Sequence, residues 1–469
     1  MTSLQQLPAN DNKDVEIERL VDALEPIRKR VAARGDTFGA CEATLLAVAN
    51  EAVRRSLEKE LQRRADDLPP EVRVDGVAYR RHQLGLGRYY GLCGELRVQR
   101  HTFREVGVRN GPTIVALDFV AGIFESSTPA FAYALTRGYA KAPIRIVEGE
   151  LRAAHRVPPS LATLDRISRA LGAAIRKNVE VVEVDIRKTE AVPEAAIAIN
   201  LGLDRTTVPM EEAIEGWDRP HRGHRNITVR YRMAYVGTLT FTDASGEPLC
   251  TRRYAAPAHR GCKGILRRLV ADIRRALVLR PELHIGVVQD NAPELWNVMR
   301  DALRGDPVIL AKGWRETVDW YHLISHLARL LAVLVKKPAE REALLAEWRK
   351  KLQRSDRAAR EIDAWLRMEG SKLPPRRRED FFRLSGMYMI HERHFRYASL
   401  KRYGLCAGSG VTEGACKSLI KMRAHRSGQR WTRDGIDAVL AVGSLLESER
   451  LESFWTRFER DHIARCVAA

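Results

Sequence analysis

The sequence lacks several features that would place it in a specialised class. Its seven cysteines are far apart and odd in number, and no two of them form a C-x-x-C pair. This usage is typical of a reduced cytoplasmic protein and argues against a structural zinc site. No run of about 18 apolar residues is present, so we expect no membrane-spanning helix. Residues 1–15 lack the apolar segment of a signal peptide and predict a disordered tail.

Acidic residues are also comparatively few. Asp and Glu number 60 against 79 for Lys and Arg, which leaves a formal charge of +19. Such an excess favours a polyanionic partner, and nucleic acid is a commoner one than a membrane surface. A basic surface that only keeps the protein in solution is the alternative. The length of 469 residues is enough for two to four domains.

The N-terminal region is predicted to be helical over residues 16–70. Apolar residues recur at helical spacing in its first part, and Pro26 predicts a bend there. A second helix is expected to begin at Asp36 or Thr37. Leu-Pro-Pro at 68–70 then breaks the pattern and predicts a linker.

Residues 71–182 are interpreted as a DNA-binding domain. Glycines punctuate short predicted strands between residues 72 and 117, and arginines are frequent among them. Two helices are expected within residues 143–177, the second capped by Ser160 and carrying Arg166 and Arg169. The alternatives to a β-ribbon and a helix-turn-helix that contact DNA are a charged sheet edge and an ordinary helical hairpin.

A pattern with a period of two residues begins near residue 195. Apolar residues alternate with small or polar ones and stop at Asp204, which predicts a strand that ends there. Further strand, hairpin, helix and strand patterns follow at residues 229–241, 248–254, 262–279 and 283–288. The last of these strands ends at Asp290. The order predicts an α/β sheet with an antiparallel front and a parallel continuation.

This α/β domain is predicted to comprise residues 190–320 and 406–455. Residues 321–405 interrupt it with a helical pattern and hold twice as many basic as acidic residues. We expect Arg376, Arg377 and Arg378 within this insertion to contact DNA.

Three isolated acids are the candidates for chemistry. Asp204 and Asp290 follow apolar strand patterns, and Glu413 stands in the first turn of a predicted helix after the glycine-rich segment 408–410. Carboxylates that converge from strand ends can hold a pair of Mg²⁺ ions, which prefer oxygen ligands. Two such ions are a standard device for phosphodiester chemistry.

The helix that carries Glu413 has a predicted basic face. Lys417 and Lys421 follow Glu413 at i+4 and i+8 and are expected to line a phosphate backbone. A surface Glu–Lys pair is the alternative. The opposite stripe is predicted to be apolar and to consist of Val411, Ala415, Leu419 and Met422.

A D-x-x-H pair, Asp319 and His322, precedes the insertion. A metal ligand or phosphate contact is one interpretation of this pair, and a hydrogen-bonded structural histidine is the other.

Four segments together carry a resemblance to a known family. They are residues 203–212 (LDRTTVPMEE), 289–292 (QDNA), 318–322 (VDWYH) and 408–415 (GSGVTEGA). In this order they resemble the DDE transposases of bacterial insertion sequences, in particular the ISKra type, which is related in style to Mutator-like enzymes. The resemblance covers residues 70–455.

The resemblance implies an RNase H-like mixed sheet interrupted by an all-helical insertion. It implies that Asp204, Asp290 and Glu413 are the catalytic, metal-binding triad and that Asp319 and His322 are auxiliary. It implies two Mg²⁺ ions, for which Mn²⁺ substitutes. The partners would be double-stranded DNA, as terminal inverted repeats and target, and a second copy of the chain on DNA, in the bacterial nucleoid.

The expected activity is hydrolysis at the ends of a mobile element, followed by transfer of the exposed 3′-hydroxyl into target DNA. A structure-selective endonuclease without strand transfer is the first alternative. A non-catalytic, domesticated DNA-binding regulator is the second.

Overall fold

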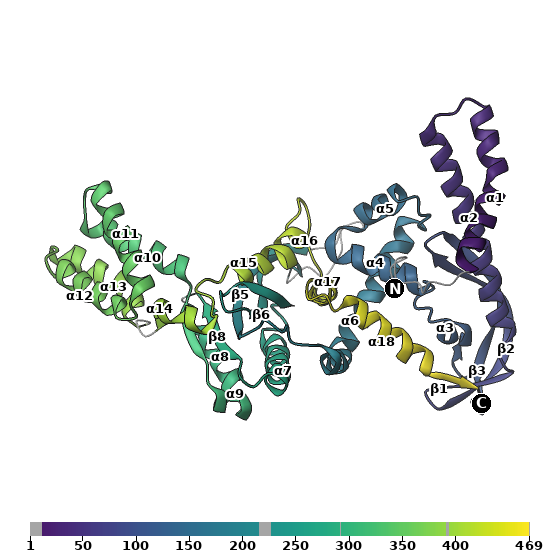
Figure 1. The fold of residues 1–469 in the computed structure, drawn as a ribbon. Coiled ribbons are helices and arrows are strands. Elements are labelled where there is room, and N and C mark those ends of the chain that lie inside the picture. The colour runs from purple at the N-terminus through teal and green to yellow at the C-terminus, as the bar shows by residue number, and fades with distance from the viewer. Residues whose placement is uncertain (1–11, 215–226, 291, 391–393, 469) are drawn as a thin grey trace. The chain divides into compact units, whose positions relative to one another are not determined.

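The computed structural model describes residues 12–214, 227–290, 292–390 and 394–468. The fold is mixed α/β, with two five-stranded sheets and many helices (Figure 1). The chain divides into two compact units, residues 1–182 with 451–469 and residues 183–450. Within the described ranges, no helix is long and apolar enough to cross a bilayer. Residues 1–11 of the predicted tail lie outside the described part.

The first unit begins with two helices, α1 (Asn12–Ala33) and α2 (Phe38–Asp66). The Thr37 hydroxyl accepts a hydrogen bond from the Ala40 amide at 3.3 Å and caps α2, so the predicted start of this helix is confirmed. Pro26 lies inside α1.

The sheet of the first unit is antiparallel throughout, in the order β10-β1-β2-β3-β4. Its strands are β1 (Glu71–Val74), β2 (Val77–Gly91), β3 (Gly94–Glu105), β4 (Thr113–Ile114) and β10 (Cys466–Ala468). The prediction of short strands is wrong for β2 and β3, which have 15 and 12 residues. They run on because each pairs with the other along most of its length.

Further helices of the first unit are α3 (Ala116–Val120), α4 (Pro129–Lys141), α5 (Ile144–Ala153) and the C-terminal α18 (Leu451–Ala464). Helix α6 (Leu161–Thr189) begins in the first unit, and its residues from Glu183 onward belong to the second. The Thr163 amide donates to the Ser160 hydroxyl at 3.4 Å, which confirms the predicted cap of α6. This helix extends past residue 177 because apolar residues continue at helical spacing through Val179, Val182 and Ile186.

The sheet of the second unit has the order β7-β6-β5-β8-β9. Its strands are β5 (Ala198–Ala213), β6 (Ile227–Thr242), β7 (Pro248–Pro257), β8 (His284–Gln289) and β9 (Arg315–Val318). Strands β5, β6 and β7 pair antiparallel, and β8 and β9 continue the sheet parallel to β5. The predicted antiparallel front and parallel continuation are confirmed.

Strand β5 corrects the prediction that a strand ends at Asp204. It continues to Ala213 because β6 pairs with it all the way to the Ala213–Ile227 pair. Its side chains are buried through Leu203 and half-buried at the next four positions. The apolar alternation therefore fades at Asp204 although the backbone pairing does not.

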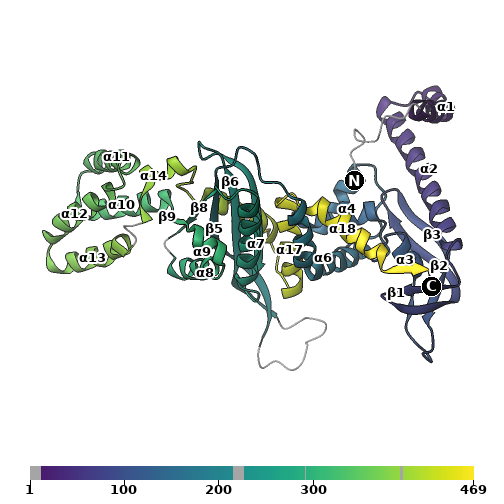
Figure 2. The same ribbon diagram turned by 60° about the horizontal axis from the view of Figure 1, so that its bottom comes forward.

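Adjacent residues of β6 show which elements cover the two faces of this sheet. Gly237 leaves room for Ile265 of α7 (Lys263–Leu279), which lies along one face (Figure 2). Thr238 points to the opposite face, where its hydroxyl bonds that of Thr412 at 2.7 Å. Short helices α8 (Pro293–Arg304) and α9 (Pro307–Lys312) separate β8 from β9.

The helical pattern predicted over residues 321–405 is confirmed. It forms α10 (Trp320–Leu334), α11 (Pro338–Arg354), α12 (Ala358–Ser371), α13 (Pro375–Ile390), α14 (Tyr397–Leu400) and a 3-10 turn at Lys401–Tyr403. Three of its aromatic residues, Phe381, Phe395 and Tyr397, are buried. These three rings therefore belong to the core.

The chain then returns to the sheet through α15 (Gly410–Ala415), a π-helical turn at Cys416–Lys421, α16 (Met422–Ala424) and α17 (Arg433–Glu447). Helix α17 is capped by Thr432, whose hydroxyl accepts from the Gly435 amide at 3.2 Å. Its buried residues pack on β7.

Candidate functional site

Three aspartates stand in one row across neighbouring parallel strands. The register of these strands pairs Leu201 with Val287 and Gln289 with Val318. Continued along the strands, it sets Asp204 beside Asp290, and Asp290 beside Asp319. Paired strands lie about 4.8 Å apart, so the row brings three carboxylates to one edge of the parallel part of the sheet.

Glu413 reaches the same face of the sheet because Gly202 has no side chain. A Cβ atom on Gly202 would overlap the side chain of Thr412, so only glycine lets α15 lie this close to β5. Gly202 and Asp204 are two residues apart on β5 and share a face. Thr412 precedes Glu413 directly, and the helix thus delivers Glu413 toward Asp204.

Asp319 is fully buried and acts as a connector. Its Oδ1 accepts the His322 amide at 2.8 Å and caps α10, and its Oδ2 accepts the Ser409 amide at 2.5 Å. The Ser409 hydroxyl in turn donates to Glu413 Oε1 at 3.2 Å. Asp319 therefore ties the start of α10 to the loop that precedes the Glu413 helix.

His322 lies between two of the aspartates. Its Nδ1 is 3.1 Å from Asp290 Oδ1 and 3.1 Å from Asp319 Oδ1, and half of its side chain is exposed. Ligand atoms of Asp319, His322 and Glu413 all lie within 4.8 Å of one another, a spacing that suits a metal ion. The D-x-x-H pair thus lies beside the predicted acids Asp290 and Glu413.

The charges of the site act on one another. Burial raises the pKa of Asp290 to about 6, with the carboxylates of Asp204, Asp319 and Glu413 adding to the effect and His322 opposing it. Burial lowers the pKa of His322, but the charge of Asp290 and the hydrogen bond to Asp319 outweigh it and leave that pKa raised. The three acids predicted as the triad, Asp204, Asp290 and Glu413, therefore belong to one group of interacting charges. We call these three residues, together with Asp319 and His322, the acid cluster.

No lysine or arginine compensates the acid cluster in the part of the chain that the structure describes. No salt bridge joins Asp204, Asp290, Asp319 or Glu413 to a Lys or Arg, and the guanidinium of Arg205 turns away to Glu294. Like charges held together without a counter-charge repel one another. Several oxygen ligands with excess negative charge fit a hard divalent cation such as Mg²⁺.

Cys416 is a further member of the site, and the sequence pattern predicts no role for it. Its Sγ donates to Asp204 Oδ2 at 3.4 Å. Burial raises the pKa of this thiol, and the charges of Asp204 and Glu413 add to the effect, so it stays protonated. Its position three residues after Glu413 on one helix was the available signal.

The predicted faces of the Glu413 helix need correction. The π-helical turn at Cys416–Lys421 widens the helix by about one residue per turn, so the i, i+4, i+8 spacing no longer defines one face. Met422 of the predicted apolar stripe is 68% exposed, and Ile420 is buried in its place. Lys417 and Lys421 are exposed, and their contact with DNA stays a prediction.

The other residues predicted to contact DNA lie on the surface. Arg166 bonds Glu125 at 3.1 Å and Arg169 bonds Asp165 at 2.8 Å, so each already has a carboxylate partner. The exposed run on α13 consists of Arg376, Arg377 and Arg378. Their contacts with DNA also stay predictions.

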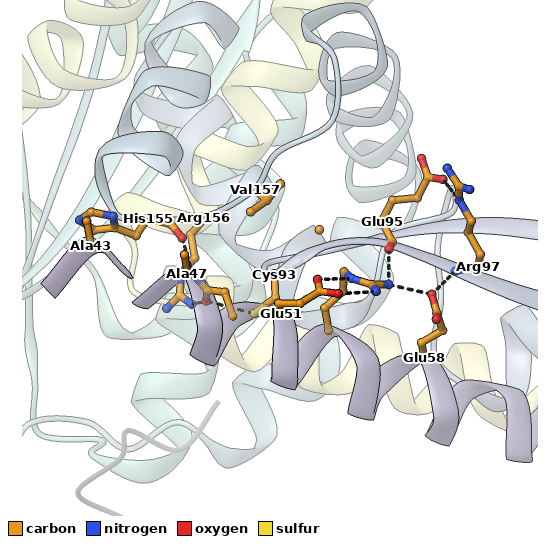
Figure 3. Close-up of a pocket in the computed structure, with 13 residues that line it drawn as sticks. Ala43, Ala47, Glu51, Glu58, Cys93, Glu95, Arg97, His155, Arg156 and Val157 are labelled. Carbon is orange, nitrogen blue, oxygen red and sulfur yellow. Dashed lines mark hydrogen bonds and ion pairs between the residues drawn. The ribbon is translucent and has the colours of Figure 1, made fainter. Parts of the chain in front are cut away.

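A pocket of about 580 Å³ in the first unit contains paired charges (Figure 3). Arg54 is held by Glu51 at 2.7 Å and Glu58 at 2.8 Å, and Arg97 by Glu95 at 2.8 Å. The pairs leave little charge for a ligand, and we assign no chemistry to this pocket.

Comparison with known proteins gives little. No protein-family model matches the sequence, and no curated protein matches it. The solved structure of the Drosophila P element transposase strand transfer complex is similar over 72% of this chain and 81% of the other, with 10% identical residues and a TM-score of 0.27. A likeness this loose carries no argument about function, so the resemblance to the ISKra type depends on the sequence motifs alone.

Proposed function

We propose that this protein is a DNA transposase that uses divalent cations on an RNase H-like core. The observation that carries the proposal is the acid cluster, in which carboxylates from β5, β8 and α15 converge without a compensating Lys or Arg among the described residues. The strand order and directions of the second sheet, the charge of +19 and the four motifs support it further.

Asp204, Asp290 and Glu413 would hold two Mg²⁺ ions, for which Mn²⁺ would substitute. Such ions, when bound, would supply positive charge to neutralise the phosphate and to activate an attacking oxygen, whether of water or of a 3′-hydroxyl. Asp319 positions the Glu413 loop through Ser409, and His322 bridges Asp290 and Asp319.

The remaining surfaces would bind DNA. The first unit would recognise the terminal inverted repeats of an element, and basic residues of the helical insertion would hold flanking or target DNA, with strong salt dependence. Cutting two ends in concert would require at least two copies of the chain.

A strand-transfer assay tests the proposal. The protein is incubated with Mg²⁺, labelled element-end DNA and a plasmid target, and joined products are the expected result. Cuts without joining would favour an endonuclease, and metal-independent binding alone would favour a non-catalytic regulator.

Two variants sharpen this assay. Asp290→Asn should reduce joining by at least about 1,000-fold and leave DNA binding nearly unchanged, because it removes metal-binding charge at the reacting phosphate. Asp301→Asn, an exposed change on α8, is the matched control and should join DNA like the wild type. Equal activity of the two variants would contradict the catalytic role of Asp290.

A further inference from the structure

A pocket of about 400 Å³ lies beside the edge strand of the second sheet. Among the described residues that line it, four are arginines and one, Glu316, is an acid. The arginines come from α8, β9 and the segment before α14, and they are Arg300, Arg304, Arg315 and Arg396. We call this the arginine pocket.

The one acid is already fully engaged. Glu316 receives two hydrogen bonds from Arg300, at 2.8 and 2.6 Å, one from the Trp314 indole at 3.1 Å, and a contact from His394 at 3.0 Å. Burial opposes ionisation, but His394 and Arg300 outweigh it and hold the pKa of Glu316 well below its usual range. Glu316 compensates Arg300 and has no charge left for the others.

The other three arginines have no carboxylate partner among the residues described. Arg304, Arg315 and Arg396 are exposed and make no salt bridge. The Arg315 guanidinium lies 3.8 Å from the centre of the Tyr403 ring, which holds it in place. Three like charges around one cavity repel one another, and a bound anion would relieve that repulsion.

We propose that the arginine pocket binds phosphate groups, either of a DNA backbone or of a free nucleoside di- or triphosphate. Guanidinium groups bind phosphate oxygens in pairs of parallel hydrogen bonds, and three of them around one cavity match adjacent phosphates. The volume falls within the roughly 300–1,000 Å³ of small-molecule sites.

The fold connects the arginine pocket with the acid cluster. Strand β9 carries Arg315 at its start and is followed at once by Asp319, a separation of roughly 13 Å along the strand. Trp296 stacks on His394 at 5.5 Å and donates its indole N–H to the Asp290 carbonyl at 2.7 Å. A DNA strand that enters the acid cluster could therefore place a neighbouring phosphate in the pocket, an assignment that rests on the proposed function.

Calorimetric titration with pyrophosphate tests the pocket without reference to that function. EDTA is present, so the acid cluster cannot recruit the probe through a metal ion. We expect wild-type protein to bind one pyrophosphate per chain and the triple variant Arg304→Ala/Arg315→Ala/Arg396→Ala to bind at least about tenfold more weakly.

The matched control removes three exposed cations from α11, Arg349→Ala/Lys350→Ala/Arg354→Ala, and should change the affinity less than about twofold. Absence of saturable binding to the wild type, or an equal loss in both triple variants, would overturn the proposal. Circular dichroism checks that each variant is folded. If the triple variant of the arginine pocket is not folded, the single change Arg304→Glu should still weaken pyrophosphate binding about threefold or more. An unchanged affinity would count against the pocket.

Displacement identifies the source of the phosphate. Release of pyrophosphate by duplex DNA assigns the pocket to the DNA backbone, and release by a nucleoside triphosphate but not by DNA assigns it to a free nucleotide. Displacement by neither would contradict the proposal. Pyrophosphate binding without strand transfer would support the phosphate site and contradict the proposed function. Strand transfer without pyrophosphate binding would support the proposed function and contradict the phosphate site.

Discussion

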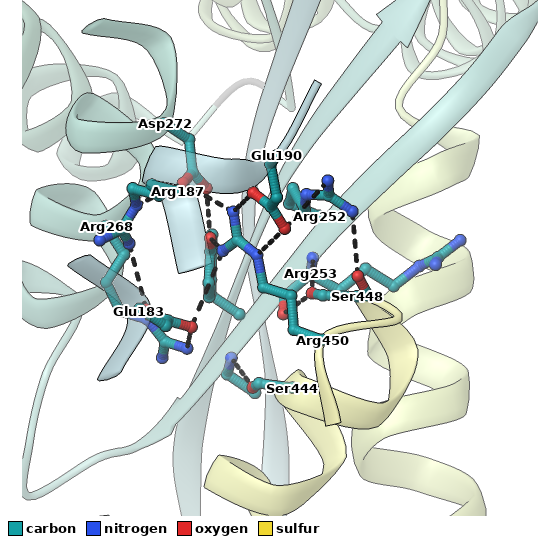
Figure 4. A network of polar contacts seen from close by, with 12 residues as sticks. Glu183, Arg187, Glu190, Arg252, Arg253, Arg268, Asp272, Ser444, Ser448 and Arg450 are labelled. Carbon is teal, nitrogen blue, oxygen red and sulfur yellow. Dashed lines mark hydrogen bonds and ion pairs between the residues drawn. The ribbon is translucent and has the colours of Figure 1, made fainter. Parts of the chain in front are cut away.

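Two groups of carboxylates in the second unit differ in how their charge is balanced. In the first, which we call the arginine network, Glu183, Glu190 and Asp272 are surrounded by arginines (Figure 4). Arg450 is 2% exposed at its side chain and lies 2.6 Å from Glu190 and 3.0 Å from Asp272. The second group is the acid cluster, where the only basic partner found among the described residues is a half-exposed histidine.

The neighbouring charges decide whether the pKa of a buried carboxyl ends up lowered or raised. Burial raises the pKa of Asp272, but Arg450 and Arg187 outweigh it and leave that pKa lowered. Burial raises the pKa of Asp290 to about 6, and neighbouring carboxylates increase the shift. The number of acids therefore does not distinguish a structural network from a candidate metal site. The absence of neighbouring arginine or lysine partners does.

The largest expected effect comes from removing the central cation of the arginine network. Arg450→Met should lower the free energy of unfolding by about 3–5 kcal/mol, because the buried Asp272 and the half-buried Glu190 would each lose one of their arginine partners. Urea denaturation measures the change. Arg274→Met, at a side chain that is 62% exposed, is the control and should stay within about 0.5 kcal/mol of the wild type. A loss below about 1 kcal/mol for Arg450→Met would mean that the network is not held by its charges.

A smaller effect is expected where the acid cluster is assembled. Gly202→Ala should cost about 1–3 kcal/mol, because its Cβ would push against Thr412 and move the helix that carries Glu413. Strand transfer should fall further than stability does. Gly414→Ala adds a methyl group to open space on the same helix and should be close to neutral. Equal activity of the two variants would show that the contact with β5 does not position Glu413.

The smallest expected effect is a pH dependence of stability that comes from Asp290 of the acid cluster. The raised pKa of Asp290 means that the folded protein keeps this proton more tightly than the unfolded chain. The resulting stabilisation is complete below the ordinary value of 3.8 and is lost as the pH rises through about 6. In EDTA, Asp290→Asn should therefore gain up to about 1 kcal/mol relative to wild type between pH 5 and pH 8, reduced by the exposure of the site. Chemical denaturation at both pH values measures this gain, and a relative loss would contradict the assigned imbalance.

Much of the second unit could be predicted from local pattern. The period of two residues identified β5 and β6, helical spacing identified α7, and the ends of the apolar patterns selected Asp204 and Asp290 as candidates. These signals depend on which side of a single element faces the core, and a sequence records that directly.

The missing parts depend on how distant elements meet. Strand β9 has only four residues, too few for a periodic pattern, and its register is what aligns Asp319 with Asp290. The contact of Cys416 with Asp204 and the convergence of four arginines on one pocket likewise join segments far apart in the chain. The π-helical turn after Glu413 has no pattern of its own, so the predicted lysine face was drawn on an ordinary helix.

Binding of Mn²⁺ is the direct test of whether the acid cluster is a metal site. Calorimetry or electron paramagnetic resonance would follow the ion in wild-type protein, in Asp290→Asn and in the control Asp301→Asn, each with and without DNA. We expect two ions per chain in the wild type and the control, and an affinity at least about tenfold weaker in Asp290→Asn. Equal binding by all three proteins would contradict the assignment of the acid cluster as a metal site.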